Sequence, residues 1–327
     1  MAALLSAMRK GSAPPEAGLN IQLLGSAVCQ KALGFPNSER RSRGRANWPF
    51  FLSFAAMLLI ALATLAAKGL PAPREAAVPS AAPGGDRLIA LTFDDGPKPY
   101  VLMGTRSGKG IPSQSLLSLL DRQGVKATFF VMGWRLSKNA DEMCRKVDGG
   151  VCREAAEEEH RRGHEIENHT YGHGDFRLMQ KRYGEQWILD DIDRASRVIQ
   201  PITSTRPAYL RPPDWDIWPE LQEKIEARGY HVMTKSRTVP PALRDVDSED
   251  YFCVGHNPAK CPKPSDYDFV LRSIQLRERQ DVERHILVFH ELPETVELLS
   301  RLIPGLKNRG YRFVLLREYM TAVKVKP

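Results

Sequence analysis

The chain has 327 residues, enough for one large domain with additional segments, and a formal net charge of +8. Residues 1–47 carry seven basic and two acidic residues, so +5 of this charge lies in that segment. A nucleic-acid-binding protein usually concentrates its basic residues on the folded domain. The distribution therefore argues against a nucleic-acid partner.

A long apolar segment follows the basic tail. Residues 48–67 contain no charged side chain, and about 20 such residues span a bilayer core as a helix. Because four arginines precede this run, the positive-inside rule predicts a cytoplasmic N-terminus. We expect a disordered basic tail at residues 1–46 and a transmembrane anchor at residues 47–68, with the rest of the chain outside the cytoplasm. A cleaved signal peptide is the alternative, with small residues at Ala66 and Ala67 as the cleavage site.

A linker and an alternating pattern of helices and strands come next. Residues 69–86 are rich in Ala, Pro and Gly, which is typical of a linker. From residue 87 to residue 322, helix-like stretches end at a basic residue and Gly, and an apolar strand follows. Seven strands are predicted, at residues 88–93, 125–132, 164–168, 208–211, 230–235, 285–290 and 311–316. This alternation predicts an α/β fold with mainly parallel strands, as a distorted barrel rather than an open doubly wound sheet.

Four of the five cysteines form two closely spaced pairs. Cys144 and Cys152, like Cys253 and Cys261, have seven residues between them, which does not match the spacing of a zinc knuckle. In an oxidising compartment these pairs predict two disulfides that staple the irregular stretches in which they lie. Four unconnected buried thiols are the alternative. Between the two pairs, the acidic run at residues 154–159 is expected to form a solvated helix face.

Polar side chains follow the carboxyl ends of several predicted strands. These ends are where α/β barrels place their sites. Asp94 and Asp95 follow the first strand, and because successive side chains of an extended chain diverge, one can bind an ion while the other acts as a base. His169 and His173 follow the third strand, and on a helical turn their spacing places both imidazoles on one side. Two histidines and one carboxylate are a common ligand set for Zn²⁺.

The combined motifs resemble those of the NodB-homology polysaccharide deacetylases, carbohydrate esterase family 4. The resemblance is carried by TFDDGP at 92–97, GVKATFF at 124–130, GHEI at 163–166, HTYGH at 169–173, RPP at 211–213 and ILVFH at 286–290. It runs from about residue 87 to residue 320. It implies a distorted (β/α)7 barrel and an enzyme that removes N- or O-acetyl groups from polysaccharides.

The resemblance also assigns a metal site. Asp95, His169 and His173 correspond to the family's metal ligands. Zn²⁺ is the expected ion, and Co²⁺ or another divalent cation is the alternative, since the same ligand set accepts several metals.

The resemblance assigns the proton-transfer groups as well. Asp94 corresponds to the general base, and His290 corresponds to the general acid. Arg211 corresponds to the arginine that orients the base, and Asp250 is expected to hold either Arg211 or His290.

The expected substrate-binding residues include departures from the family pattern. Tyr251 replaces the usual Trp, so the apolar wall near the acetyl group is changed. Asp214 and Trp215 follow Pro213, where the family usually has Tyr-Gly or a similar pair. The backbone amide after the prolines is expected to help bind the oxyanion. These departures bear on substrate choice more than on the chemistry.

The sequence therefore predicts a metal-dependent hydrolase that releases acetate from a cell-envelope or extracellular polysaccharide, with N-acetylglucosamine units as the expected substrate. The expected partners are this polysaccharide and, through the N-terminal helix, the cytoplasmic membrane. An O-acetyl esterase acting on xylan-like glycans is one alternative. A glycan-binding pseudoenzyme is another, although a binding protein has no need of both an acid and a base.

Overall fold

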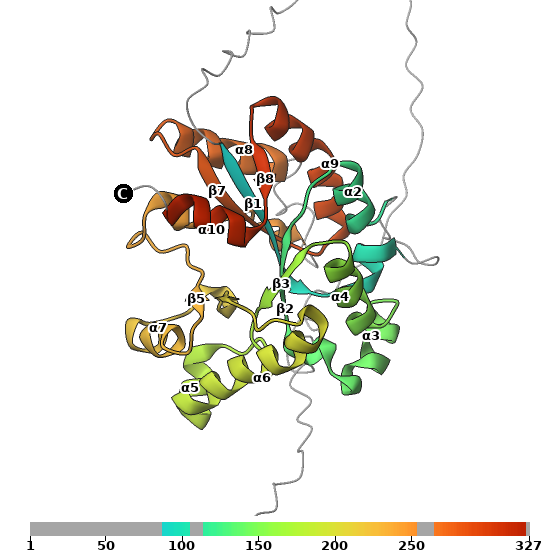
Figure 1. Ribbon diagram of the computed structural model, residues 1–327, viewed down its shortest axis with the longest axis vertical. Coiled ribbons are helices and arrows are strands. Elements are labelled where there is room, and N and C mark those ends of the chain that lie inside the picture. Colours follow the sequence, from blue (N-terminus) through green and yellow to red (C-terminus); the bar gives the residue numbers. More distant parts are fainter. Residues whose placement is uncertain (1–86, 105–113, 254–264, 325–327) are drawn as a thin grey trace, which may run out of the picture. The chain divides into compact units, whose positions relative to one another are not determined.

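One parallel β-sheet organises the part of the chain that this computed structural model describes, namely residues 87–104, 114–253 and 265–324 (Figure 1). The strand order is β5-β4-β3-β2-β1-β7-β6, and β8 also pairs with β1. The strands are β1 (Leu88–Gly96), β2 (Thr128–Val131), β3 (Glu165–Asn168), β4 (Tyr209–Leu210), β5 (His231–Val232), β6 (Asp245–Asp247), β7 (Arg284–His290) and β8 (Arg312–Val314). The predicted α/β fold with parallel strands is confirmed.

The two edges of this sheet meet at a single point. Thr234 and Arg244 form an isolated parallel bridge, and the N–H group of Asp245 donates to the carbonyl oxygen of Thr234 at 2.9 Å. Apart from this bridge β5 and β6 are not paired, so the curved sheet is a parallel half-barrel and not a closed barrel. Strand β6 was not predicted, because its sequence Asp-Val-Asp is rich in a residue type that strands disfavour. Strands β4 and β5 are shorter than predicted, with two residues each.

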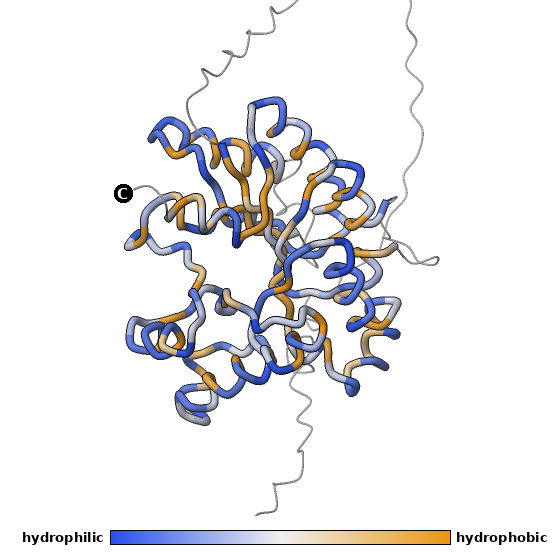
Figure 2. The backbone as a smooth tube through the Cα atoms, in the orientation of Figure 1, coloured by the Kyte–Doolittle hydropathy of each residue, from blue (hydrophilic) through white to orange (hydrophobic). Residues whose placement is uncertain are grey.

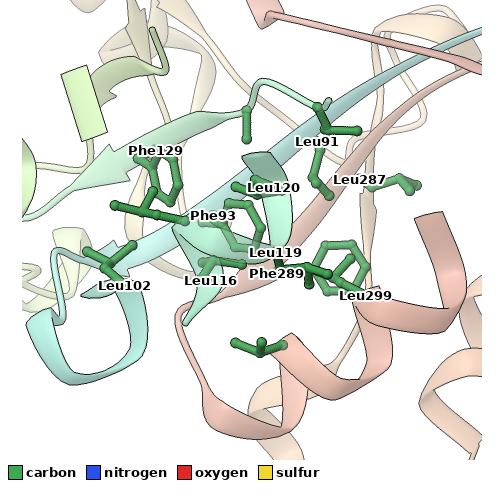
Figure 3. Close-up of a cluster of buried hydrophobic side chains, with 14 of the residues drawn as sticks. Leu91, Phe93, Leu102, Leu116, Leu119, Leu120, Phe129, Leu287, Phe289 and Leu299 are labelled. Carbon is green, nitrogen blue, oxygen red and sulfur yellow. The ribbon is translucent and has the colours of Figure 1, made fainter. Parts of the chain in front are cut away.

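Strand β1 is the centre of the core. Its first half is a nearly continuous apolar run, as expected for a strand that is buried on both faces. Alternate side chains enter different clusters: Leu91 and Phe93 pack beneath the outer helices, whereas Ala90 packs on the other face with Phe130. The Phe93 ring lies 5.0 Å from that of Phe129, centroid to centroid (Figure 3). Burying each such ring stabilises the fold by roughly 1.5–3 kcal/mol.

Helices surround the sheet and present polar residues outward (Figure 2). Helix α6 shows why they form: its buried residues Ile188, Ile192, Ala195 and Ile199 recur every three or four positions, which makes one apolar face. The α-helices are α2 (Leu116–Arg122), α3 (Asp141–Val147), α4 (Cys152–Arg161), α5 (Phe176–Tyr183), α6 (Glu185–Thr203), α7 (Pro219–Glu226), α8 (Ser265–Glu278), α9 (Pro293–Asn308) and α10 (Leu316–Lys324).

The predicted helix-to-strand joints have the expected backbone. Gly163 and Gly310 follow α4 and α9 with φ of 80° and 85°, the left-handed conformation that glycine adopts most easily. At the other end of a helix, the carboxylate of Asp175 accepts the N–H group of Leu178 at 2.8 Å and caps α5. This cap fixes the start of α5 directly after the HTYGH segment.

The stretch that carries the first cysteine pair, residues 139–151, was expected to be irregular but is helical as far as Val147. It contains α3, and a disulfide joins Cys144 in α3 to Cys152 at the start of α4, with Cα atoms 5.7 Å apart. The run at residues 154–159 is not uniformly solvated, because the side chain of Glu159 is fully buried. The second expected disulfide involves Cys261, which lies outside the described residues, and stays a prediction.

Within residues 87–104, 114–253 and 265–324, no helix is both long and apolar enough to cross a membrane. The expected tail, anchor and linker at residues 1–46, 47–68 and 69–86 lie outside these ranges.

Candidate active site

A pocket of about 140 Å³ lies where several strands end, and it gathers residues that are far apart in the sequence. It is lined by Asp94, Asp95, His169, His173, Pro212, Asp214, Trp215, Tyr251 and His290. The position of the pocket at the carboxyl ends of parallel strands is the one expected for an α/β barrel. The candidate residues therefore converge as the sequence predicted, but Arg211, Asp250 and Pro213 are not among the lining residues. Arg211 and Asp250 instead contact the lining residues Asp94 and His290. Pro213 is buried at the start of a 3₁₀ turn (Pro213–Trp215), and Pro212 lines the pocket in its place.

One carboxylate and two imidazoles form a compact cluster. The Oδ1 atom of Asp95 lies 3.3 Å from Nε2 of His169 and 3.2 Å from Nε2 of His173. Nδ1 of His169 lies 2.7 Å from the carbonyl oxygen of Arg211. Because a carbonyl oxygen only accepts, Nδ1 must carry the proton, and the lone pair of a neutral His169 is then on Nε2, directed at Asp95.

The HTYGH segment is an irregular loop and not a helical turn. Thr170 and His173 have φ of 64° and 52°, so the backbone enters the left-handed region twice. The loop is held from outside, since the carboxylate of Asp191 on α6 accepts the N–H group of Tyr171 at 2.9 Å. Sequence reasoning missed Asp191. Its signal was an acidic residue among apolar positions at helical spacing, namely Ile188, Ile192 and Ala195, where charged residues are rare unless paired.

This cluster fits a divalent cation. Oδ1 of Asp95 is buried and accepts no hydrogen bond from the described residues. Burial alone would raise the pKa of Asp95, but the neighbouring His169 and His173 hold that pKa well below its ordinary value. The carboxylate is therefore ionised, and with two imidazole nitrogens it forms a donor set suited to Zn²⁺ or a similar ion.

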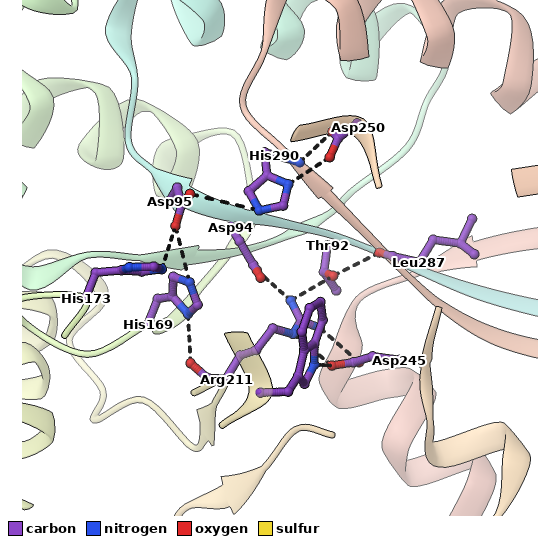
Figure 4. Close-up of polar contacts among 11 residues, drawn as sticks. Thr92, Asp94, Asp95, His169, His173, Arg211, Asp245, Asp250, Leu287 and His290 are labelled. Carbon is purple, nitrogen blue, oxygen red and sulfur yellow. Dashed lines mark hydrogen bonds and ion pairs between the residues drawn. The ribbon is translucent and has the colours of Figure 1, made fainter. Parts of the chain in front are cut away.

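Asp94 belongs to a separate, buried network (Figure 4). Nη1 of Arg211 donates to Oδ1 of Asp94 at 2.6 Å and to Oγ1 of Thr92 at 3.1 Å. On its other side Arg211 makes a bidentate pair with Asp245, with Nε to Oδ2 at 2.9 Å and Nη2 to Oδ1 at 3.0 Å. As predicted, the adjacent carboxylates Asp94 and Asp95 diverge toward different partners. Asp245 was missed, because it lies on the unpredicted strand β6.

Asp250 was expected to hold either Arg211 or His290, and it holds His290. Oδ1 of Asp250 lies 2.7 Å from the ring nitrogen Nδ1 of His290, and Oδ2 accepts a hydrogen bond from the backbone N–H group of His290 at 2.8 Å. Thr295 donates a third hydrogen bond to Oδ2 at 2.6 Å. Burial alone would lower the pKa of His290, but the bond to Asp250 raises it to about 9. His290 is thus cationic at neutral pH, with Nε2 lying 3.9 Å from Oδ2 of Asp95.

The remaining pocket residues are aromatic or acidic. Asp214 and Trp215 both have φ of 54°, a left-handed turn that is unusual for residues other than glycine. The indole N–H group of Trp215 donates to Oδ2 of Asp245 at 2.7 Å. The ring of Tyr251 packs edge-on against His290, with centroids 5.0 Å apart.

The fold and the site together define a class. A parallel half-barrel that holds an Asp/His/His cluster, a buried Asp–Arg pair and an Asp–His pair in one pocket is built for hydrolysis with acid and base assistance.

Comparison with known proteins specifies this class. Residues 81–233 match the polysaccharide deacetylase family. A peptidoglycan-N-acetylglucosamine deacetylase of Bacillus cereus is 25% identical over 242 residues, which cover 73% of this chain and 90% of the relative. A chitin deacetylase of Colletotrichum lindemuthianum is 26% identical over 241 residues, covering 71% and 78%. Peptidoglycan deacetylase PdaC from Bacillus subtilis has the same fold, with a TM-score of 0.51 and 22% identity over 73% of this chain and 92% of that one.

The resemblance read from the motifs is therefore confirmed: residues 81–233 match the polysaccharide deacetylase family, and the relatives over most of the chain are deacetylases of this kind. The protein's enzyme class is that of the hydrolases that act on carbon–nitrogen bonds other than peptide bonds.

Proposed function

We propose that the protein hydrolyses N-acetyl groups on N-acetylglucosamine units of a cell-envelope or extracellular polysaccharide, releasing acetate and a free amino sugar. The observation that carries the proposal is the pocket itself. It brings together Asp94, which is hydrogen-bonded to Arg211, the cationic His290, and the Asp/His/His cluster. The names of the Bacillus and Colletotrichum relatives support N-acetylglucosamine polymers as the substrate class.

Asp95, His169 and His173 are the residues that would hold the metal, for which we propose Zn²⁺. A divalent ion at such a cluster supplies Lewis-acid activation of the acetyl carbonyl group and of a water molecule. The protein's own contribution is to keep Asp95 ionised and to fix the tautomer of His169 through the carbonyl group of Arg211.

Asp94 is the proposed general base. Its carboxylate takes a proton from the attacking water, and the water oxygen forms the new bond to the acetyl carbon. Arg211 is fully buried and donates to Oδ1 of Asp94, so it fixes the direction of this carboxylate. The oxyanion that forms is proposed to accept a hydrogen bond from the backbone amide of Asp214.

His290 is the proposed general acid. An amide nitrogen leaves poorly without a proton, so a cationic imidazole beside it is required when the carbon–nitrogen bond breaks. Asp250 holds Nδ1 of His290 and keeps the ring protonated, which leaves Nε2 to donate its proton to the leaving amine. Trp215 and Tyr251 are proposed to form the walls that contact the sugar.

We further propose that residues 47–68 anchor the protein in the cytoplasmic membrane, with the N-terminus in the cytoplasm and the catalytic domain outside. This proposal is supported by the uncharged run at residues 48–67 and the basic residues before it.

The test is acetate release by the full-length protein in detergent, produced in an oxidising compartment. Substrates are N-acetylglucosamine oligomers, isolated peptidoglycan and O-acetylated xylan, each with and without a chelator. Chelator-sensitive release from the first two, restored by Zn²⁺, is expected. Release from xylan alone would replace the proposal with an O-acetyl esterase. No release from any of the three by a folded, metal-loaded protein would overturn it.

A further inference from the structure

Asp245 connects two parts of the site that have different tasks. Its side chain is fully buried on β6, and its two oxygens accept three hydrogen bonds. Two come from the guanidinium group of Arg211, and the third comes from the indole N–H group of Trp215 at 2.7 Å. Oδ2 is shared, since it accepts from both Nε of Arg211 and Nε1 of Trp215.

Trp215 is held at a second place. Nζ of Lys235 lies 4.1 Å from the centroid of the Trp215 ring, and Lys235 is itself paired with Asp247 at 3.3 Å. Trp215 lines the pocket and has a left-handed backbone, a conformation that persists only when the surroundings hold it. The bond to Asp245 is thus one of the contacts that fix the orientation of this indole ring.

We propose that Asp245 is a positioning residue that locks the Trp215 wall to the Arg211–Asp94 pair, so that the wall and the base form one unit selective for a glycan ring. The link runs from Nε1 of Trp215 through Asp245 and Arg211 to Oδ1 of Asp94, with hydrogen bonds of 2.6–3.0 Å. A broad aromatic wall of fixed orientation binds the apolar face of a sugar ring, whereas a small acetyl ester makes little use of it.

This inference rests on the proposed deacetylation, and kinetic variants separate the two. Trp215→Phe keeps an aromatic wall but removes the N–H donor. We expect it to raise KM for an N-acetylglucosamine oligomer by about tenfold, the usual effect of losing a hydrogen bond to a charged group, with kcat changed less than about threefold. Trp218→Phe is the matched control, since Trp218 stacks on Arg177 and makes no contact with Asp245, and its KM should equal the wild-type value.

Asp245→Asn tests the link itself. Because Trp215 acts through its hydrogen bond to Asp245, the double variant Asp245→Asn/Trp215→Phe should have the same KM as Asp245→Asn alone. Independent, additive effects would overturn the inference, as would a Trp215→Phe variant that behaves like Trp218→Phe.

A spectroscopic measurement on the wild-type protein does not depend on activity. The indole N–H resonance of Trp215 should exchange with solvent slowly, and at least about tenfold faster in Asp245→Asn, because a buried bond to a carboxylate protects it. Equal exchange rates in the two proteins would overturn the link. A protected resonance in a protein that releases no acetate would leave the link standing and remove the proposed deacetylation.

Discussion

At the scale of single residues, the site separates three tasks among neighbouring carboxylates. Asp95 faces the two histidines, Asp94 faces Arg211, and Asp250 faces His290. Each environment is different, so carboxylates that are chemically alike acquire different roles.

The first prediction concerns the base. Asp94→Asn keeps the size of the side chain but removes the group that accepts a proton. We expect kcat to fall by roughly 10²–10⁴-fold, the usual contribution of a general base. Bound metal, measured by atomic emission after dialysis, should stay at the wild-type ratio, whereas His169→Ala should lose it. An Asp94→Asn variant with full activity would exclude Asp94 as the base.

The second prediction concerns pH. Asp250 raises the pKa of His290 to about 9, and a general acid works only when it is protonated. The rate kcat/KM should therefore hold up to about pH 9 and fall above it. Asp250→Asn removes the charge that raises this pKa, so its alkaline limb should move to lower pH. Identical alkaline limbs in the two proteins would separate Asp250 from the acid.

Much of the site could be predicted because its residues lie in short motifs that follow strands. Asp94, Asp95, His169 and His173 needed only the local sequence. Asp245 could not be predicted in the same way, because its importance comes from Arg211, which is 34 positions earlier in the chain.

At the scale of elements, a disulfide joins α3 to the first residue of α4, next to an ion pair between the segments that precede and follow α3. The Cys144–Cys152 disulfide lies beside the buried pair of Arg135 and Asp148, whose Nη1 and Oδ2 atoms are 2.6 Å apart. Replacing both cysteines with Ala should lower the free energy of unfolding by about 2–3 kcal/mol, as expected for a short closed loop. Chemical denaturation of the oxidised protein and of the double variant measures this difference, and equal midpoints would contradict it.

One residue of α4, the buried Glu159, lowers the free energy of unfolding. Burial, with a smaller contribution from Glu291, raises the pKa of Glu159 well above its ordinary value, and neither carboxyl oxygen has a hydrogen-bond partner among the described residues. The folded state therefore favours the protonated form, so this residue costs stability increasingly as pH rises above the ordinary Glu pKa. Glu159→Gln should raise Tm more at pH 8 than at pH 5. The exposed Glu154→Gln on the same helix is the control, and equal gains at both pH values would contradict this prediction.

The long elements were predictable and the short ones were not. The helix-to-strand joints at Gly163 and Gly310 follow from local backbone preferences. Strand β6 and the two-residue strands β4 and β5 exist because neighbouring strands pair with them, which no local pattern records.

At the scale of the whole molecule, the anchor proposed at residues 47–68 would decide where the enzyme works. If residues 47–68 form the proposed anchor, the full-length protein should sediment with membranes and resist extraction by high salt, because salt screens surface charges but does not weaken apolar burial in the bilayer. A variant that lacks residues 1–68 should stay in the supernatant. A full-length protein found in the supernatant at its complete mass would remove the anchor, and one shortened near Ala67 would indicate a cleaved signal peptide.

The general α/β architecture was readable from the alternation of elements, but the way the half-barrel holds together was not. Its edges meet at one bridge between Thr234 and Arg244, a contact between two chain segments without a regular pattern.

Arg211 has one further consequence. Its buried guanidinium group contacts Asp94 on β1 and Asp245 on β6, and lies 4.1 Å from the centroid of the Phe130 ring on β2, while its backbone follows β4. Strands that are distant in the chain must therefore all be in place before Arg211 can orient the carboxylate of Asp94. The enzyme should therefore have no partly active intermediate: during denaturation, catalytic activity should disappear along the same curve as the sheet itself.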